Sequence, residues 1–215
     1  MPELPEAETI ARDLGALIVG HRIRRVRVHR EEVVEPMTPR AFSRRLTGRT
    51  VERVDRRAKW ISALLDDGRR WLTQLRMTGR FTWSPPAPLR REPHLSVSLL
   101  FDGSNGQGGD GGDGGEGGGV VRFYDVRRFG RMYVLDAVEW GKLDTRLGPE
   151  PLSDQFTSQT LARVLEASKA PLRNVLIDQR RIAGVGNIYA NEACFLARLD
   201  PRRPAATIRD AEVQR

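Results

Sequence analysis

The chain begins with a potential nucleophile beside carboxylic acids, because its first six residues are Met1-Pro2-Glu3-Leu4-Pro5-Glu6. Met1 precedes a small residue and is a target for removal, which would leave Pro2 with a free secondary amine. An N-terminal amine has a pKa of about 7.7–8.0, against about 10.4 for lysine, so a useful fraction is unprotonated at neutral pH. Such an amine can attack a carbonyl-like carbon and form an iminium, which is a strong electron sink. A purely structural interpretation competes with this one, because proline also suits the first turn of a helix.

The residues that follow Pro2 and Glu3 predict a helix over 5–18, which would position these two residues. Four apolar side chains fall on one helical face: Ile10, Leu14, Leu17 and Ile18. The N-terminal end of that helix therefore lies next to Pro2 and Glu3. Its partial positive charge disfavours a protonated amine and favours ionised carboxylates.

From residue 22 to 135 the pattern changes to short alternating strands, which favour a β-sandwich. The clearest strands are 23–28, 60–65, 95–101 and 120–124, and a short helix is expected over 39–47. Residues 103–119 form a glycine-rich tract with three acids, Asp110, Asp113 and Glu116, and no apolar side chain. We expect that tract to be a disordered loop. Its acids argue against a phosphate-binding glycine loop.

After a linker that includes residues 147–152, the pattern becomes helical. We predict helices over 158–168, 171–182 and 187–197, and the start of another after Thr207. Gly184 and Gly186 permit positive backbone dihedrals in the turn between the second and third helices, and Asn187 is a suitable N-cap. The sequence thus predicts an α+β protein, with a β-sandwich domain with flanking helices at 1–135, a linker at 136–152 and a helical domain at 153–215.

Composition favours a polyanionic partner, because the net charge is +8 and the pI is about 10.6. Lys59, Lys142 and Lys169 are the only lysines among 36 basic residues, so a lysine at 59 suggests that a compact ammonium is needed there. The single cysteine, Cys194, excludes a disulfide or a multi-cysteine zinc site within these residues. No apolar stretch approaches the ~20 residues of a membrane span, and we expect a cytoplasmic monomer.

Five segments of the sequence stand in a recognisable order. The first segment is Met1-Pro2-Glu3-Leu4-Pro5-Glu6-Ala7-Glu8-Thr9, and the second and third are Arg57-Ala58-Lys59 and Gln74-Leu75-Arg76-Met77-Thr78-Gly79. The last two are Asp125-Val126-Arg127-Arg128-Phe129-Gly130 and Ala183-Gly184-Val185-Gly186-Asn187-Ile188-Tyr189-Ala190-Asn191-Glu192. Together they resemble the formamidopyrimidine-DNA glycosylase family, which excises oxidised purines from DNA, and the resemblance runs from residue 1 to about 204. Gln74 and Val126 depart from the histidine and proline expected in the family, but neither position carries chemistry.

The resemblance implies catalytic roles for the N-terminal motif. Pro2 would be the nucleophile, and Glu3 the general acid–base that protonates the sugar ring or the leaving group. Lys59 matches a position that contacts DNA near the lesion. Glu6 would face the same pocket and help to position the damaged nucleotide.

The resemblance also implies how the protein would hold DNA. A base must leave the stack before its sugar carbon can be attacked, so a wedge must fill the space it leaves. Met77, Arg127 and Phe129 match the family's void-filling residues, and Arg128 and Asn187 match phosphate contacts. The turn before Asn187 resembles the helix-two-turn-helix that binds the DNA backbone in this family.

The implied activity is that of a bifunctional glycosylase and abasic-site lyase acting on damaged double-stranded DNA without a cofactor in this chain. The family continues beyond the equivalent of residue 215 to a lesion-covering loop and a four-cysteine zinc finger, so we expect a C-terminally truncated member with an incomplete helical domain. Two alternatives stay open. One is a non-catalytic DNA-binding remnant, and the other is an endonuclease VIII-like enzyme for oxidised pyrimidines, which Leu4 and the Arg127-Arg128-Phe129 set disfavour.

Overall fold

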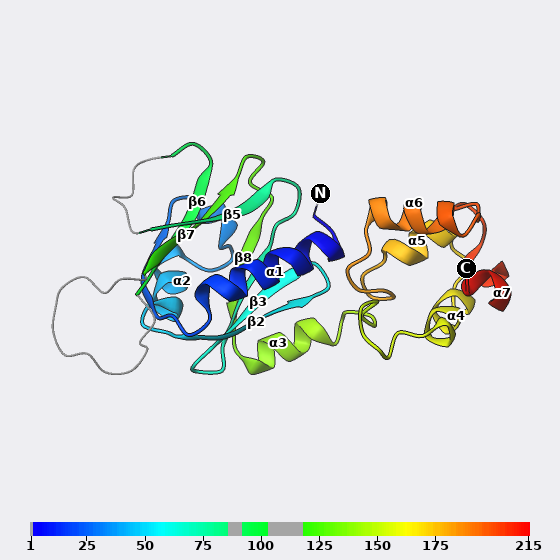
Figure 1. Ribbon diagram of the computed structural model, residues 1–215, viewed down its shortest axis with the longest axis horizontal. Helices are drawn as coiled ribbons and strands as arrows, with labels where there is room; N and C mark the ends of the chain where they lie inside the picture. Colours follow the sequence, from blue (N-terminus) through cyan, green and yellow to red (C-terminus); the bar gives the residue numbers. More distant parts are fainter. Residues whose placement is uncertain (1, 86–91, 103–117) are drawn as a thin grey trace. The chain divides into compact units, whose positions relative to one another are not determined.

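The computed structural model describes residues 2–85, 92–102 and 118–215, which divide into two compact units (Figure 1). The first unit comprises Met1–Pro2, Ala7–Arg56 and Trp60–Trp140, and the second comprises Glu3–Glu6, Arg57–Lys59 and Gly141–Arg215. Two short segments from the N-terminal half, residues 3–6 and 57–59, therefore pack with the C-terminal helices. Residues 103–117 of the predicted glycine-rich loop lie outside the described residues.

Two antiparallel sheets form the frame of the first unit, which confirms the predicted β-sandwich. One sheet has the order β1-β6-β7-β5, with bounds Ile23–Val28, Leu95–Phe101, Gly119–Asp125 and Gly79–Ser84. The other has the order β2-β3-β4-β8, with bounds Val51–Arg57, Trp60–Leu65, Arg70–Gln74 and Arg131–Leu135.

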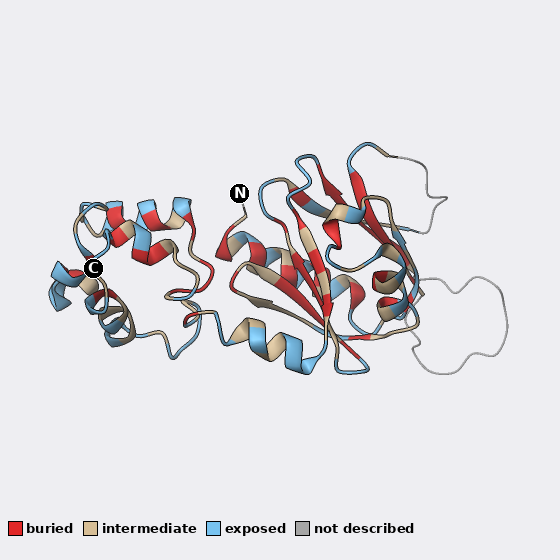
Figure 2. Cartoon of the chain, turned by 180° about the vertical axis from the view of Figure 1, so that it is seen from behind, coloured by how far each residue is buried: buried red, intermediate tan, exposed pale blue. Residues whose placement is uncertain are grey.

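One hydrophobic core joins the inner faces of these sheets. It contains Phe101 and Phe123 from the first sheet and Trp71 and Val134 from the second, none more than 2% exposed. Figure 2 shows buried residues running along the strands of both sheets. Burial of apolar area on both inner faces contributes roughly 25 cal/mol per Å² and holds the loops between strands in fixed places.

Helix α1 (Leu4–Ile18) is anchored to this core. Leu14 and Ile18 are buried in it, while Ile10 and Leu17 are partly buried against it, as the predicted helical face required. An ion pair adds a polar contact, because Arg56 Nε donates to Glu8 Oε2 at 2.8 Å with only 5% of the arginine side chain exposed. The packing of α1 therefore constrains where the N-terminal residues can lie.

The first unit also contains a short 3₁₀ helix (Glu31–Val33) and helix α2 (Pro39–Leu46), and α2 matches the prediction over 39–47. Thr38 caps it, since its hydroxyl accepts a hydrogen bond from the Ala41 N–H at 3.2 Å. Phe42 and Leu46 are fully buried in the core.

The second unit is helical. Its helices are α4 (Ser158–Glu166), α5 (Leu172–Ile177), α6 (Asn187–Leu196) and α7 (Asp210–Val213), and α3 (Ala137–Asp144) leads into it. A separate core holds them together through Leu165, Leu172, Val175, Ala190 and Cys194, all less than 4% exposed. Residues 137–144 were expected to be part of a linker, but they form helix α3.

The helix predicted over 171–182 is too long, because α5 ends at Ile177. Gln179 explains the early end. Its amide nitrogen donates to the carbonyls of Ile177 and Val185, and its oxygen accepts from the Gly184 N–H at 2.9 Å. These side-chain bonds satisfy backbone groups that a longer helix would have paired internally, so they stabilise a turn before α6.

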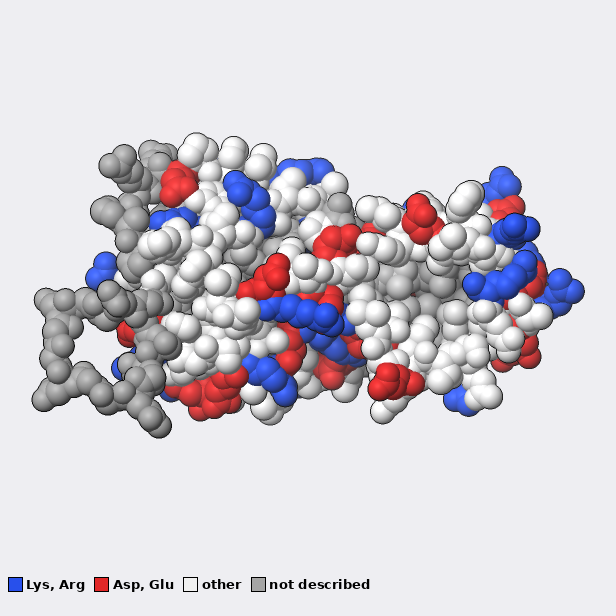
Figure 3. Space-filling model, in the orientation of Figure 1, with Lys and Arg blue, Asp and Glu red and all other residues white. Residues whose placement is uncertain are grey.

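Basic and acidic side chains are interspersed on the face of the molecule shown in Figure 3. The excess of arginine is therefore not gathered into a single patch on that face. Among the described residues, no helix is both long and apolar enough to cross a membrane.

Candidate active site

Glu3 lies at the N-terminus of α6, within the second unit. Its side chain is fully buried, at 0% exposure. Oε1 accepts from the Ile188 N–H at 3.0 Å and Oε2 from the Tyr189 N–H at 3.2 Å. Both N–H groups belong to the first turn of α6, where backbone donors have no partner within the helix. The buried carboxylate is therefore held in one orientation by the positive end of a helix dipole.

Gly186 is a glycine for steric reasons. A Cβ at this position would lie 2.3 Å from Glu3 Cδ, 2.3 Å from Glu3 Oε1 and 2.6 Å from Lys59 Nζ. The backbone there is extended, at φ −128°, so Gly186 does not use the positive dihedral that glycine permits, whereas Gly184 does, at +86°. The Glu3 carboxylate and the Lys59 ammonium thus face the same small space, which only a residue without a side chain leaves open.

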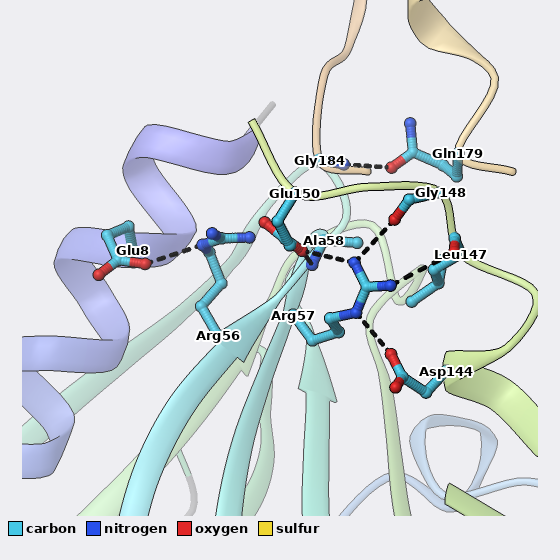
Figure 4. Close-up of polar contacts among 10 residues, drawn as sticks. All are labelled: Glu8, Arg56, Arg57, Ala58, Asp144, Leu147, Gly148, Glu150, Gln179 and Gly184. Atoms are coloured by element: carbon cyan, nitrogen blue, oxygen red, sulfur yellow. Dashed lines mark hydrogen bonds and ion pairs between the residues drawn. The ribbon is translucent and has the colours of Figure 1, made fainter. Parts of the chain in front are cut away.

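The position of Lys59 is set by its two neighbours. Arg57 is half-buried, and its guanidinium donates to four acceptors at the end of α3 and in the loop that follows it: Asp144 Oδ1 at 2.5 Å, Glu150 Oε1 at 2.9 Å, and the carbonyls of Leu147 at 3.3 Å and Gly148 at 3.0 Å (Figure 4). Ala58 has a positive φ of 54°, and its N–H donates to the same Glu150 oxygen at 2.5 Å. The loop after α3 therefore fixes the backbone that leads into Lys59.

Arg57 remains charged throughout the accessible pH range. Burial alone would lower the pKa of Arg57, but the hydrogen bonds and charges of Glu150 and Asp144 raise it above its usual value. Sequence reasoning treated Arg57 as part of a motif without a role. Its only sequence signal was its place directly before Ala58 and Lys59.

Glu6 also lies in the second unit and contacts Glu3. Its Oε2 accepts from the Glu3 N–H at 2.9 Å, and its Oε1 accepts from the Tyr189 hydroxyl at 2.9 Å. Burial alone would raise the pKa of Glu6, but these two donors outweigh it and hold the pKa below the ordinary value. Pro2 is covalently attached to Glu3 and is half-buried, although its packing contacts belong to the first unit.

Three residues predicted to fill the space of an extruded base lie together in the first unit. Arg127 Nη1 lies 2.9 Å from Met77 Sδ, and the guanidinium carbon lies 4.8 Å from the centroid of the Phe129 ring. Met77 is 44% exposed and Phe129 is 47% exposed. Exposed apolar side chains packed around one arginine are suited to insertion between bases. We call Met77, Arg127 and Phe129 the exposed triplet.

A buried aspartate supports the exposed triplet. Asp125 is 1% exposed, and its Oδ1 accepts from Thr78 Oγ1 at 2.5 Å and from the Arg127 N–H at 3.2 Å. Its Oδ2 accepts from the Gly130 N–H at 2.6 Å. Asp125 therefore joins the loop that carries Met77 to the loop that carries Arg127 and Phe129. No role for Asp125 was predicted from the sequence, because its only signal was its place at the start of the motif.

The two predicted phosphate contacts belong to different units. Arg128, in the first unit, has a positive φ of 59° and lies 3.6 Å from Glu32 Oε1, with 53% of its side chain exposed. Asn187 is exposed in the second unit, and its Oδ1 accepts from Arg173 Nη2 at 2.8 Å. Asn187 is the first residue of α6 and Gly186 occupies the N-cap position, so the prediction that Asn187 caps the helix is wrong by one residue. Because its oxygen faces Arg173, its amide hydrogens remain available as donors.

The residues of this sequence do not fit the four-cysteine zinc site expected in the family that it resembles. Cys194 is the sole cysteine of the sequence and is buried in the core of the second unit. Within the part of the chain that the structure describes, no group of three or more metal-binding side chains comes together.

Both units match known protein families. Residues 1–132 match the model described as the formamidopyrimidine-DNA glycosylase N-terminal domain, and residues 147–215 match the model of its H2TH domain. The formamidopyrimidine-DNA glycosylase of Moorella thermoacetica is 41% identical over 218 residues, covering 100% of this chain and 74% of the relative. The corresponding protein of a Roseiflexus species is 43% identical over 215 residues, covering 99% of this chain and 73% of the relative.

Solved structures show the same fold in complexes with damaged DNA. One is the Lactococcus lactis protein with DNA containing an abasic site, at a TM-score of 0.83 and 27% identity, covering 99% of this chain and 73% of that chain. Another is the Lactococcus lactis protein with DNA containing FAPY-dG, at a TM-score of 0.83 and 27% identity, covering 99% of this chain and 74% of that chain.

Proposed function

The chain belongs to the formamidopyrimidine-DNA glycosylase family of base-excision repair proteins, and on this premise we propose that it excises oxidised purines from duplex DNA and then cleaves the abasic site. The substrates we propose are 8-oxoguanine and formamidopyrimidines. The observation that carries the proposal is that the buried Glu3 carboxylate and the Lys59 ammonium both lie against Gly186. Glu3 is the residue directly after Pro2 in the sequence.

The proposed nucleophile is the Pro2 nitrogen, free once Met1 is removed. Its lone pair attacks C1′ of the damaged nucleotide while the bond from C1′ to the base breaks. The Glu3 carboxylate takes up the proton that the Pro2 nitrogen loses and passes it to the sugar ring oxygen or the departing base, and water protonates the other. The C1′–O4′ bond breaks as the ring opens, and the nitrogen lone pair forms an iminium with C1′.

Strand cleavage follows from the same covalent adduct. The iminium makes the C2′ proton acidic, and its loss expels the 3′ phosphate by breaking the C3′–O bond. A second elimination breaks the C5′–O bond and expels the 5′ phosphate, and water then releases the sugar fragment from Pro2. The ammonium of Lys59, close to Glu3, suits a phosphate of the damaged nucleotide.

The exposed triplet is suited to a reaction in which the damaged base leaves the DNA duplex. Met77 and Phe129 would occupy the space left in the stack, and Arg127 would donate to the unpaired base on the opposite strand. Arg128 and the amide hydrogens of Asn187 would hold the backbone phosphates on either side.

An assay on a duplex with one 8-oxoguanine tests this function. We expect release of the free base together with strand ends that carry phosphate on both sides of the gap, and no cleavage of the undamaged duplex. Base release and strand ends are quantified separately, by chromatography and by gel electrophoresis. Tight binding to the damaged duplex with no base released and no cleavage of a ready-made abasic site would contradict the proposal and favour a non-catalytic DNA-binding protein.

A further inference from the structure

Tyr189 contacts both acidic residues of the N-terminal motif through different atoms. Its backbone N–H donates to Glu3 Oε2 at 3.2 Å, and its hydroxyl donates to Glu6 Oε1 at 2.9 Å. Glu6 Oε2 in turn accepts from the Glu3 N–H at 2.9 Å. The three residues form a closed ring of hydrogen bonds within the second unit.

The direction of the hydroxyl bond is fixed by charge. An ionised carboxylate only accepts hydrogen bonds, so the tyrosine hydroxyl must be the donor. The bond to Glu6 raises the pKa of Tyr189, and the donors on Glu6 hold the pKa of that carboxyl below its usual value. A neutral tyrosine therefore faces an ionised Glu6 at every pH at which the amine of Pro2 is a useful nucleophile.

The Glu3 N–H belongs to the peptide group that joins it to Pro2. That group is planar and includes the Cα of Pro2, one bond from the nitrogen proposed to attack the sugar. A hydrogen bond that fixes the direction of the Glu3 N–H thus fixes the plane on which the Pro2 ring is mounted. Glu6 makes this bond, and Tyr189 sets the orientation of the Glu6 carboxylate.

We propose that Tyr189 is a positioning residue that acts through Glu6 to orient the peptide bearing the Pro2 nucleophile. The inference rests on the proposed function, because it concerns how Pro2 reaches the sugar. The hydroxyl is the part that matters, since the backbone N–H of any residue at 189 could still bind Glu3.

The variant Tyr189→Phe removes this hydroxyl and leaves the ring and the backbone. Without that donor Glu6 can leave the Glu3 N–H, so amide hydrogen exchange at Glu3, measured by NMR, is expected to become about tenfold faster. Iminium formation with a ready-made abasic site, trapped by borohydride at saturating protein, is expected to slow by about tenfold to a hundredfold. Affinity for a tetrahydrofuran-containing duplex is expected to change little.

A second tyrosine provides the matched control. Tyr133 of β8 packs against Trp60, at a centroid distance of 5.5 Å, in the first unit. Tyr133→Phe removes a hydroxyl from the same residue type, and we expect neither the trapping rate nor the exchange at Glu3 to change. Adding Tyr189→Phe to Glu6→Ala is expected to slow trapping no further than Glu6→Ala alone, because both changes remove the same interaction.

Three results would overturn the inference. They are unchanged Glu3 exchange in Tyr189→Phe, an unchanged trapping rate, or full additivity with Glu6→Ala. If the unaltered protein traps abasic-site DNA while any of these holds, only the role of Tyr189 fails. If the unaltered protein traps none, the proposed function fails as well.

Discussion

Replacing Glu3 by glutamine is expected to lower the single-turnover rate of base excision by about 10²–10⁴-fold, the usual contribution of a positioned general acid. In the proposed mechanism the carboxyl group passes a proton to the sugar ring oxygen or the departing base, and an amide cannot take that role. The rate is measured with excess protein on a duplex containing 8-oxoguanine, so that product release does not limit it. An excision rate within threefold of the unaltered protein would remove Glu3 from the chemistry.

This substitution is also expected to disturb the first turn of α6. Both Glu3 oxygens accept backbone N–H groups, whereas glutamine offers one oxygen and a donor NH₂ group. One N–H of α6 would then face another donor, and leaving that buried group without an acceptor costs about 1–3 kcal/mol of folding free energy. Glu6→Gln is the comparison, because its amide can accept from the Glu3 N–H while donating to the Tyr189 hydroxyl. Glu6→Gln is expected to keep excision within about tenfold of the unaltered rate.

Gly186→Ala is expected to impair excision at least as severely as Glu3→Gln. The added methyl group would lie 2.3 Å from the Glu3 carboxyl carbon and 2.6 Å from Lys59 Nζ, so one or both side chains must move. Displacing Glu3 breaks two hydrogen bonds to a charged group, each contributing about 1.5–3 kcal/mol. The thermal unfolding midpoint is therefore expected to fall together with activity.

Gly141→Ala is the matched control. Gly141 lies inside α3, and a Cβ there would meet no atom within 4 Å. Alanine is favoured over glycine inside a helix by up to ~1 kcal/mol, so stability should hold or rise, with excision unchanged. If Gly186→Ala behaves like Gly141→Ala in both measurements, the crowding at Gly186 does not matter for the site.

The sequence predicted the elements whose apolar residues follow a period. The strands 23–28, 60–65 and 95–101 and the helices beginning at 158 and 187 lie where their patterns placed them, because each buries apolar side chains in one of the two cores. Helix α3 has no buried residue, so no period revealed it. The end of α5 was missed because it depends on hydrogen bonds from one side chain, that of Gln179.

The candidate site was predicted less completely, because its contacts join distant positions. A local rule explained Gly186 by the positive dihedral that glycine permits, but the structure explains it by its close neighbours, residues 3 and 59. The place of Glu3 at the start of α6 likewise depends on a contact across more than 180 residues. The resemblance to a family identified Met77, Arg127 and Phe129, whereas the buried Asp125 that joins their loops became visible only in the structure.

The central claim, that the Pro2 nitrogen forms the bond to the sugar, is tested most directly by locating that bond. The protein is incubated with abasic-site DNA, reduced with borohydride and digested, and the peptide that carries the sugar remnant is identified by mass spectrometry. The account predicts the remnant on Pro2 in protein that lacks Met1, and no trapping when the N-terminus is blocked. A remnant on Lys59 or another side chain, or equal trapping by blocked and free protein, would contradict it.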